Sequence, residues 1–264
     1  MSNFRLFDGF DRSTKKDWEE RALRELKDAS LKDRLTHVID DHIAIDSYIS
    51  SEEATVVNDR PGELPLVRGV KRAGNAWRVT QPIDVDDPAA NDTFLNALMC
   101  GADSVELHGS ESHITSAVRG VQLSAIDIQL AEGSVAALRW FIHEAERQDV
   151  PKHEFSFCAS LSKEADLSGV KELIAKYPLL RLYSVNDHRI STKDGMLSST
   201  LEVLRAARSV LEKLIHSGFT IDDAAARIQF KLHIGDDLFV EAARMRAMRQ
   251  IWAEVIAAKD PHHA

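Results

Sequence analysis

The chain has 264 residues, 44% of them hydrophobic and 28% charged, which is typical of a folded globular protein and not of a disordered one. Its formal net charge of −9 argues against a nucleic-acid partner, because nucleic-acid surfaces need clustered lysines and arginines. The sequence shows no apolar run long enough to cross a bilayer and no apolar signal segment. We therefore expect no membrane partner and a cytoplasmic location.

The first part of the chain predicts a helix, a hairpin and an extended arm. Ser13 is a plausible N-cap, and apolar residues follow it at helical spacing. Isoleucines alternate with polar residues within 35–50, which predicts a short hairpin or edge strand. Prolines and glycines punctuate 51–74, which indicates an arm or linker. We predict two domains, residues 1–74 with these elements and residues 75–264.

From residue 75 onward, short β-rich runs alternate with stretches of helical periodicity. The predicted strands are 76–81, 103–109, 124–130, 154–160, 179–185 and 227–233. The predicted helices are 89–100, 114–121, 135–148, 168–176, 194–216 and 237–258. This alternation predicts an α/β fold with parallel strands, either a doubly wound sheet or a (β/α) TIM-type barrel. We favour the barrel, incomplete at about six strand-helix units, because its strands can alternate between apolar and polar residues.

Four blocks of the sequence resemble the methylmalonyl-CoA mutase family in order and spacing: residues 60–69, 76–81, 90–109 and 228–252. The last block is the most specific. The family pattern there is close to F-x-x-x-I-G-x-x-F-F-x-E-x-A-K/R-x-R-A-x-R-x-x-W, and only Leu238 departs from it. The matching residues are Phe230, Ile234, Gly235, Phe239, Glu241, Ala243, Arg244, Arg246, Ala247, Arg249 and Trp252. The N-terminal helix and hairpin look like the opening of the small, non-catalytic subunit of heterodimeric bacterial mutases.

The resemblance implies a definite chemistry for the family. Its catalytic members interconvert methylmalonyl-CoA and succinyl-CoA with adenosylcobalamin, thread the CoA ester through the barrel, and hold the cofactor on a separate domain with a D-x-H-x-x-G motif. This sequence lacks that motif. Two arginines and a tyrosine contact the substrate in the first strand of catalytic relatives, and the corresponding positions here are Asn75, Thr80 and Pro82. We therefore assign no catalytic, cofactor-binding or metal-binding residue, because these replacements remove the charged hydrogen bonds.

The leading hypothesis is a non-catalytic structural partner of a catalytic mutase large subunit in a heterodimer, inactive as a single chain. One alternative is a chain that still binds a CoA ester. Another is an independent small barrel enzyme, whose acid and base would come from Asp187, His188, His233 and Asp236 after the fifth and sixth strands. Whether this chain is an enzyme is left open by the sequence.

Other polar clusters have plain structural explanations. Residues 108–113, HGSESH, could bind a metal but are more typical of a polar loop. Asp236 and Asp237 could simply cap the next helix. Arg244, together with Arg246 and Arg249, indicates a solvated or salt-bridged helix face, or a face that a partner subunit uses. The two cysteines, Cys100 and Cys158, lie in no disulfide or zinc spacing, so we expect two buried thiols.

Overall fold

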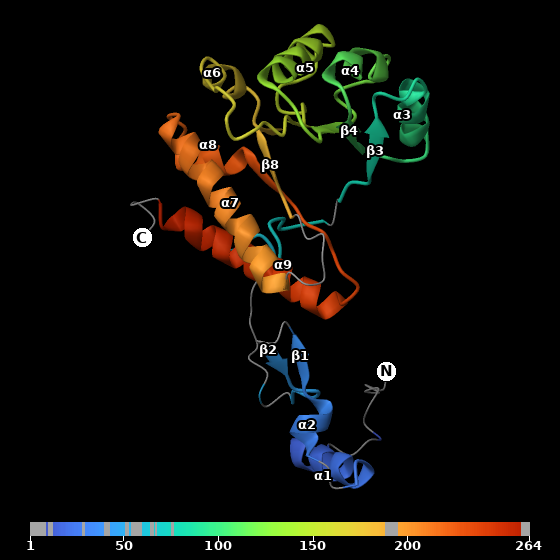
Figure 1. Cartoon of the computed structure of the whole chain (residues 1–264), viewed down its shortest axis with the longest axis vertical. Helices are drawn as coiled ribbons and strands as arrows, with labels where there is room; N and C mark the ends of the chain where they lie inside the picture. Colours follow the sequence, from blue (N-terminus) through green and yellow to red (C-terminus); the bar gives the residue numbers. More distant parts are fainter. Residues whose placement is uncertain are drawn as a thin grey trace, which may run out of the picture. The chain divides into compact units, whose positions relative to one another are not determined.

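The computed structural model describes residues 9, 13–27, 30–39, 43–50, 53, 60–63, 66, 68–74, 77–187 and 195–259 (Figure 1). By its contacts the chain divides into two compact units. The smaller contains Met1–Asn58 with Gly195–Leu197, and the larger contains Asp59–Asp194 with Ser198–Ala264. The predicted domain boundary after residue 74 remains a prediction.

The smaller unit consists of two helices and a hairpin, α1 (Lys15–Glu25), α2 (Leu31–Leu35), β1 (His37–Ile39) and β2 (Ile43–Ile45). Helix α1 is capped by Thr14 and not by the predicted Ser13. The Thr14 hydroxyl accepts a hydrogen bond from the Asp17 N–H, and the Asp17 carboxylate accepts one from the Thr14 N–H, which is a capping box. The predicted hairpin is confirmed, because β1 and β2 pair antiparallel with His37 opposite Ile45. Helix α2 was not predicted.

The larger unit is built on parallel strands that follow one another in chain order. Strands β3 (Thr80–Asp84), β4 (Ser104–His108), β5 (Asp127–Leu130), β6 (Phe157–Cys158) and β7 (Leu180–Arg181) form a five-stranded sheet. Strands β8 (Tyr183–Asn186) and β9 (Ile228–Lys231) form a further parallel pair. The predicted α/β fold with a parallel sheet is therefore confirmed, although most strands are shorter than the predicted runs.

The predicted strand at 179–185 is divided into β7 and β8 by a single residue, Leu182. The N–H groups of Leu182 and Tyr183 donate to the same carbonyl oxygen, that of Arg227, at 2.8 and 3.1 Å. Two residues against one on the neighbouring strand is a β-bulge. The β8–β9 pair thus continues the five-stranded sheet across this bulge.

Helices flank the sheet of the larger unit (Figure 1). They are α3 (Ala90–Met99), α4 (Glu111–Ala117), α5 (Val135–Arg147), α6 (Lys171–Ile174), α7 (Met196–His216), α8 (Ile221–Ala226) and α9 (Leu238–Ala257). Helix α6 begins later than predicted, because Gly169 has a φ of 69°, which lies outside the right-handed helical region, and it ends at Ile174, before the predicted end. Helix α8 was missed. Its signal is the N-cap Thr220, whose hydroxyl accepts from the Asp223 N–H.

Strand β3 begins four residues later than the first strand predicted after residue 74, and it includes Pro82. Proline is tolerated here because the backbone hydrogen bonds of successive residues in a strand point alternately to its two sides. The Ser104 N–H donates to the Val79 carbonyl at 3.1 Å, and the Val85 N–H donates to the His108 carbonyl at 2.8 Å. In a parallel pair, alternate residues bond to the same neighbour, so the backbone of Pro82 faces away from β4. Its missing N–H therefore costs no hydrogen bond inside the sheet.

The two faces of the sheet differ in polarity. Val105, Leu107, Ile128 and Leu130 alternate with polar residues and are buried with the helices in one apolar core. The core includes Phe141 of α5, whose ring lies 4.4 Å from that of Phe157. The opposite, inner face presents polar side chains of the same strands. This alternation is the feature that favoured a barrel in the sequence.

The sheet curls toward this inner face. Gln229 of β9 donates to Gln129 of β5 at 2.9 Å, and Lys231 of β9 donates to Glu106 of β4 at 2.6 Å. Strands β4 and β9 are not neighbours, and adjacent strands lie about 4.8 Å apart. A flat sheet would therefore keep these side chains apart. A curved parallel sheet flanked by helices is consistent with a partial α/β barrel, while TIM-type closure stays a prediction.

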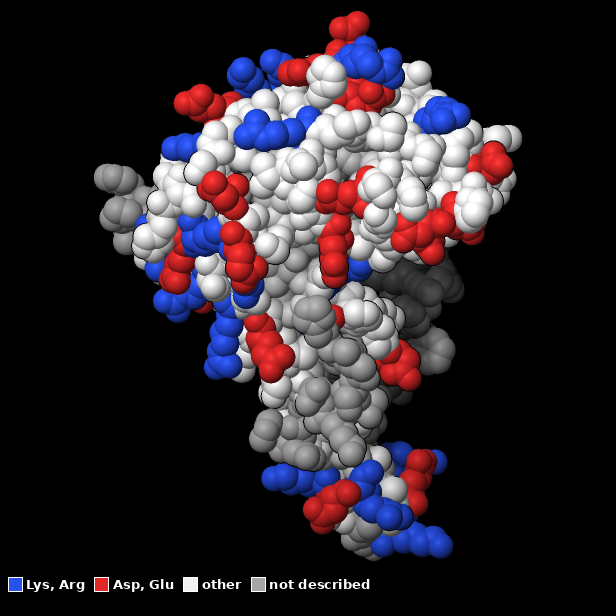
Figure 2. Space-filling model, turned by 45° about the horizontal axis from the view of Figure 1, so that its top comes forward, with Lys and Arg blue, Asp and Glu red and all other residues white. Residues whose placement is uncertain are grey.

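The surface of the described part carries charges of both signs. On the face drawn in Figure 2, basic and acidic side chains are interspersed. None of the helices in the described part of the chain is long and apolar enough to cross a membrane.

Candidate functional site

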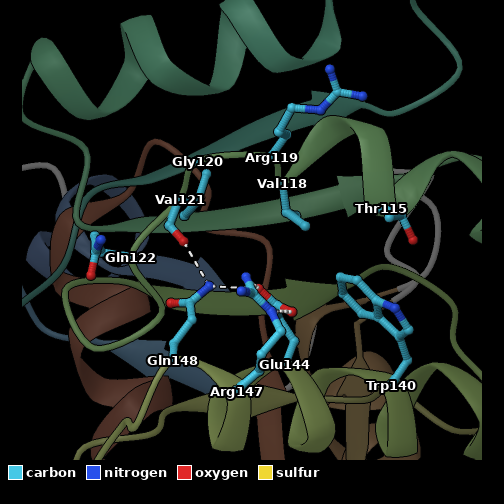
Figure 3. Close-up of a pocket in the computed structure, with 10 residues that line it drawn as sticks. All are labelled: Thr115, Val118, Arg119, Gly120, Val121, Gln122, Trp140, Glu144, Arg147 and Gln148. Carbon is cyan, nitrogen blue, oxygen red and sulfur yellow. Dashed lines mark hydrogen bonds and ion pairs between the residues drawn. The ribbon is translucent and has the colours of Figure 1, made fainter.

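A surface pocket of about 460 Å³ lies between the end of α4 and α5 (Figure 3). Three of its polar side chains, those of Glu144, Arg147 and Gln148, are held by hydrogen bonds within the pocket wall. Arg147 donates to the two Glu144 oxygens at 2.6 and 2.7 Å, and the Gln148 amide donates to the Val121 carbonyl at 3.1 Å. Arg147 holds the pKa of the Glu144 carboxyl below its usual range. Glu144 and Arg147 therefore neutralise each other, while Arg119 also lines the pocket and no catalytic pair of side chains is formed among the lining residues that the structure describes.

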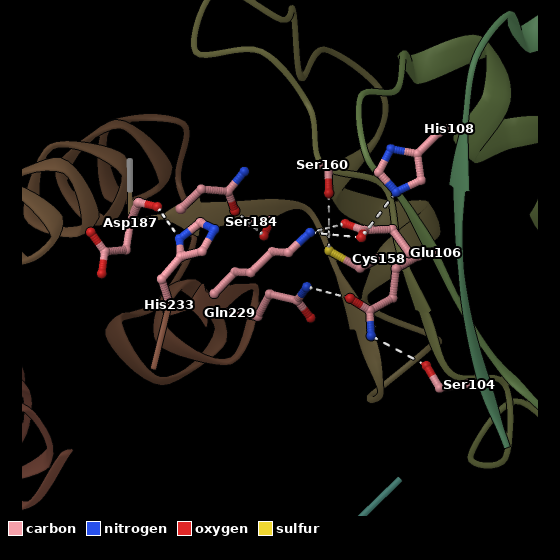
Figure 4. Close-up of polar contacts among 12 residues, drawn as sticks. Ser104, Glu106, His108, Cys158, Ser160, Ser184, Asp187, Gln229 and His233 are labelled. Atoms are coloured by element: carbon pink, nitrogen blue, oxygen red, sulfur yellow. Dashed lines mark hydrogen bonds and ion pairs between the residues drawn. The ribbon is translucent and has the colours of Figure 1, made fainter. Parts of the chain in front are cut away.

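The inner face of the curved sheet gathers more functional side chains. Figure 4 labels side chains of β4, β6, β8 and β9 that lie around this face, and Gln129 of β5 joins them through its hydrogen bonds. Glu106 lies at the centre, with His108 Nε2 at 3.1 Å and Lys231 Nζ at 2.6 Å from the same carboxylate oxygen. The Gln129 amide links the Gln229 side chain to the Ser104 hydroxyl, at 2.9 and 3.4 Å. These contacts join opposite sides of the inner face.

A second cluster on this face surrounds Asp127, whose carboxylate is buried. It accepts hydrogen bonds from Arg181 at 2.5 Å and from the Ser156 hydroxyl at 2.6 Å, and Arg78 lies 3.5 Å away. Arginine is the side chain best suited to bind a carboxylate or phosphate. Both arginines here instead contact an acid of the chain itself.

Two of the substrate positions implied by the family resemblance lie on this inner face. In β3, Thr80 pairs with Ser104 and Pro82 pairs with Glu106. Neither Thr80 nor Pro82 carries a positive charge, and the strand beside them contributes a negative one. Asn75, the third position, lies outside the described residues. A substrate carboxylate in this place would meet Glu106 and no cation from β3.

The structure brings together two of the residues of the alternative enzyme site, Asp187 and His233, but not as a catalytic pair. Asp187 is 1% exposed, and its carboxylate accepts from Arg244 at 2.7 Å and from the Ser199 hydroxyl at 2.6 Å. His233 Nδ1 lies 2.7 Å from the backbone oxygen of Asp187, not from its carboxylate. Asp236 is exposed, and His188 lies outside the described residues. Asp187 and His233 are thus close, but not arranged as an acid and its base.

The sequence predicts a solvated or salt-bridged helix face for Arg244 but does not identify Asp187 as its partner. Arg244 is salt-bridged but buried, because it points from α9 toward Asp187. Glu241 lies 3.4 Å from Arg244 and also accepts the Gly235 N–H at 3.0 Å. Gly235, Glu241 and Arg244 all belong to the family pattern. Their shared place in that pattern is the feature of the sequence that could have indicated this buried cluster. Phe230 and Trp252, at the ends of that pattern, pack edge to face with ring centroids 5.1 Å apart.

In the HGSESH run, His108 ends β4 and Glu111 begins α4, so the predicted polar loop is limited to Gly109 and Ser110. Its side chains contact different elements. His113 lies 2.8 Å from Asp86, and Glu111 accepts from Ser134 at 2.8 Å. The Ser110 N–H and the His113 ring hold the pKa of Asp86 below its usual range. Within the described ranges, no three His, Cys, Asp or Glu side chains are grouped to hold a metal ion.

Of the other predictions made for single residues, those for Asp237 and Cys158 are confirmed and that for Cys100 is wrong. Asp237 caps α9, since its carboxylate accepts the Val240 N–H at 3.1 Å. Cys158 is buried as predicted, and this burial raises the pKa of its thiol. Cys100 is exposed, so the prediction of a buried thiol is wrong there. It is the C-cap of α3, the residue that follows Met99.

Comparison with known proteins confirms the resemblance inferred from the sequence. Residues 192–263 match the family model described as methylmalonyl-CoA mutase. The chain is 23% identical to the methylmalonyl-CoA mutase small subunit of Porphyromonas gingivalis, covering 96% of this chain and 45% of that protein. It is 27% identical to the small subunit of Streptomyces virginiae, covering 95% and 44%. It is 25% identical to that of Propionibacterium freudenreichii subsp. shermanii, covering 93% and 44%. The chain therefore spans less than half the length of these relatives.

Proposed function

We propose that this chain, which resembles methylmalonyl-CoA mutase small subunits over most of its length, is a non-catalytic framework partner of a catalytic mutase chain. In this proposal it is a TIM-type barrel segment of a heterodimer whose other chain interconverts methylmalonyl-CoA and succinyl-CoA. The names of its relatives support the assignment, and the cytoplasmic location expected from the sequence is part of it. No activity is assigned to this chain alone.

The observation that carries the proposal is the pairing of side chains across the inner face. Lys231 of β9 binds Glu106 of β4, and Gln229 of β9 binds Gln129 of β5. An acyl-CoA threaded along this face would have to break the charge-assisted Lys231–Glu106 pair. It would also place its own carboxylate beside Glu106. In this proposal the chain keeps the framework of the family, while its own side chains occupy the path that the substrate takes in catalytic members.

The cofactor of the family fits the catalytic chain better than this one. The sequence lacks the D-x-H-x-x-G motif. Of the histidines near the carboxyl ends of the strands, His108 contacts Glu106 and His233 contacts the Asp187 carbonyl, so each already uses a ring nitrogen. We assign adenosylcobalamin to the partner and derive no chemical step through it here.

The two alternatives have less support. A CoA-binding role is opposed by the filled inner face and by the neutral residues Thr80 and Pro82. An independent enzyme would need Asp187 as an acid or base, yet this carboxylate is buried against Arg244 and Ser199. A buried, ion-paired carboxylate is poorly placed to exchange a proton with a substrate.

The test is assembly with a purified catalytic mutase chain that carries the D-x-H-x-x-G domain. We expect gel filtration with light scattering to show one peak at the summed mass of the two chains. A catalytic chain mixed with an unrelated barrel protein of similar acidity is the control and should stay separate. Two separate peaks at micromolar concentrations of both chains would contradict the proposal.

A further inference from the structure

The pocket of about 460 Å³ between the end of α4 and α5 has the size of a small-molecule site (Figure 3). Val118 and Val121 line it and are 6% and 2% exposed, so they form an apolar floor. Helix α5 packs against the apolar face of the sheet. The pocket is therefore separate from the inner face and from the proposed framework role.

One wall of the pocket is a stripe of side chains on α5. Trp140, Glu144 and Arg147 are spaced four and three residues apart, so they share one face of the helix, as Figure 3 shows. The next residue, Phe141, points into the core and is fully buried. Trp140 is only half-buried. An aromatic surface and a cation thus lie on the same wall, two helical turns or about 10 Å apart along the axis.

Arg147 is held in place with part of its guanidinium unused. Its Nε and one terminal nitrogen donate to the two Glu144 oxygens at 2.7 and 2.6 Å. The Gln148 amide fixes Glu144 in turn, donating to it at 2.8 Å and to the Val121 carbonyl at 3.1 Å. A guanidinium has five N–H donors. The other terminal nitrogen of Arg147 makes no hydrogen bond to any residue that the structure describes, and its position is already fixed for a ligand.

The pocket offers hydrogen-bond donors and one surplus positive charge. Further donors without a partner among the described residues are the Trp140 indole N–H and the side chains of Thr115, Arg119 and Gln122. The lining residues include two arginines and one acid, Glu144, which gives a net charge of +1. Arg147 holds the pKa of Glu144 below its usual range, so this acid stays charged and paired. Such a lining favours a ligand with a single negative charge.

We propose that this pocket binds an aromatic carboxylate with one negative charge. The ring lies against the Trp140 indole, and the carboxylate accepts hydrogen bonds from the unused side of Arg147, with Arg119 as the second cation. Because the indole and the guanidinium are two turns apart, the ligand needs a short chain between its ring and its carboxylate. Ligands with several negative charges fit less well, since the lining has only one surplus charge and the chain carries −9.

The probe is 4-phenylbutyrate, which has a ring, a three-carbon chain and one carboxylate. We expect isothermal titration calorimetry of the full chain to show one site with a dissociation constant of about 1 mM, as suits a ligand of about a dozen non-hydrogen atoms. Two matched controls lack one feature each. 4-Phenylbutanol has no charge and butyrate has no ring, and both should bind about tenfold more weakly. Adenosine monophosphate, a ring with a doubly charged phosphate, should also bind more weakly than the probe.

Variants on α5 locate the site. Arg147→Met should weaken binding of the probe about tenfold, because it removes the charged donor. Arg139→Met is the matched control, since Arg139 is an exposed arginine of the same helix that does not line the pocket. It should change binding less than about twofold. The probe should also quench the tryptophan fluorescence of the chain, and Trp140→Phe should abolish this quenching. Circular dichroism checks that each variant is folded.

Four results would overturn the inference. The first is the absence of saturable binding at about 10 mM probe, ten times the expected dissociation constant. The second is equal binding of 4-phenylbutyrate and 4-phenylbutanol. The third is equal weakening by Arg147→Met and Arg139→Met, which would place the carboxylate elsewhere. The fourth is binding of adenosine monophosphate as tight as that of the probe, which would contradict the preference for a single charge.

Discussion

At the scale of single residues, Asp187 and Arg244 explain why the most specific block of the sequence matches its family. Asp187 ends β8 and Arg244 lies on α9, and their side chains meet at 2.7 Å in the interior. Glu241 and Gly235 are connected to the same cluster. These residues hold α9 onto the sheet. The family pattern therefore describes a framework in this chain.

Arg244→Met should lower the free energy of unfolding by about 3–5 kcal/mol, because it removes the guanidinium that binds the buried Asp187 carboxylate at 2.7 Å. Urea unfolding followed by circular dichroism measures this change. Arg246→Met is the control, since Arg246 is exposed and its replacement should alter stability by less than about 0.5 kcal/mol. Equal effects of the two substitutions would mean that the buried pair has no special role.

The two cysteines should differ in reactivity. Cys100 is exposed, while burial both shields the Cys158 thiol and raises its pKa, so little thiolate forms there at pH 8. We expect one thiol to react rapidly with an aromatic disulfide reagent in the native protein and the second only after unfolding. Cys100→Ser should abolish the rapid phase. Rapid reaction of both thiols in the native chain is the result that this account does not allow.

At the scale of elements, the first turn of α9 distinguishes two adjacent acids. Asp237 accepts the Val240 N–H, while Asp236 is exposed before the helix. Asp237→Ala should cost about 1 kcal/mol of stability by removing the cap. Asp236→Ala should cost less than about 0.5 kcal/mol. Thermal unfolding of both variants measures the two losses of stability. A larger loss for Asp236→Ala than for Asp237→Ala would mean that Asp237 is not the cap.

The order and type of most elements could be predicted from the sequence because hydrophobic periodicity is local information. The predicted strand boundaries were wrong where hydrogen bonding to a neighbouring strand, and not the local sequence pattern, decides where a strand begins or ends. The predicted strand stops at residue 81, but β3 continues through Pro82 to Asp84, because the backbone of Pro82 faces away from β4. The bulge at Leu182 divides one predicted strand into two, which only the position of Arg227 on the neighbouring strand determines.

The candidate site could be predicted only in part. A motif alignment was enough to find Thr80 and Pro82 in place of charged and aromatic residues. The filled inner face could not be found in this way, because Glu106 and Lys231 are 125 residues apart and meet only through the curvature of the sheet. The same holds for Arg181, whose bond to Asp127 spans 54 residues.

At the scale of the whole molecule, the larger unit combines a preserved apolar core with an inner face whose charges neutralise one another. The core residues of the sheet and helices form one cluster. Glu106 and Asp127, on the inner face, each bind cations supplied by other strands of the same chain. A barrel built to take a substrate keeps such cations open for it. We therefore interpret the inner face as part of the framework.

The most direct test of this central claim is a calorimetric titration of the full chain with methylmalonyl-CoA at neutral pH, with a catalytic mutase chain as the positive control. The account predicts no saturable heat from this chain at ligand concentrations that saturate the control. Saturable heat with about one site per chain, lost when Lys231 is replaced by alanine, would contradict it, because the inner face would then be a working substrate site.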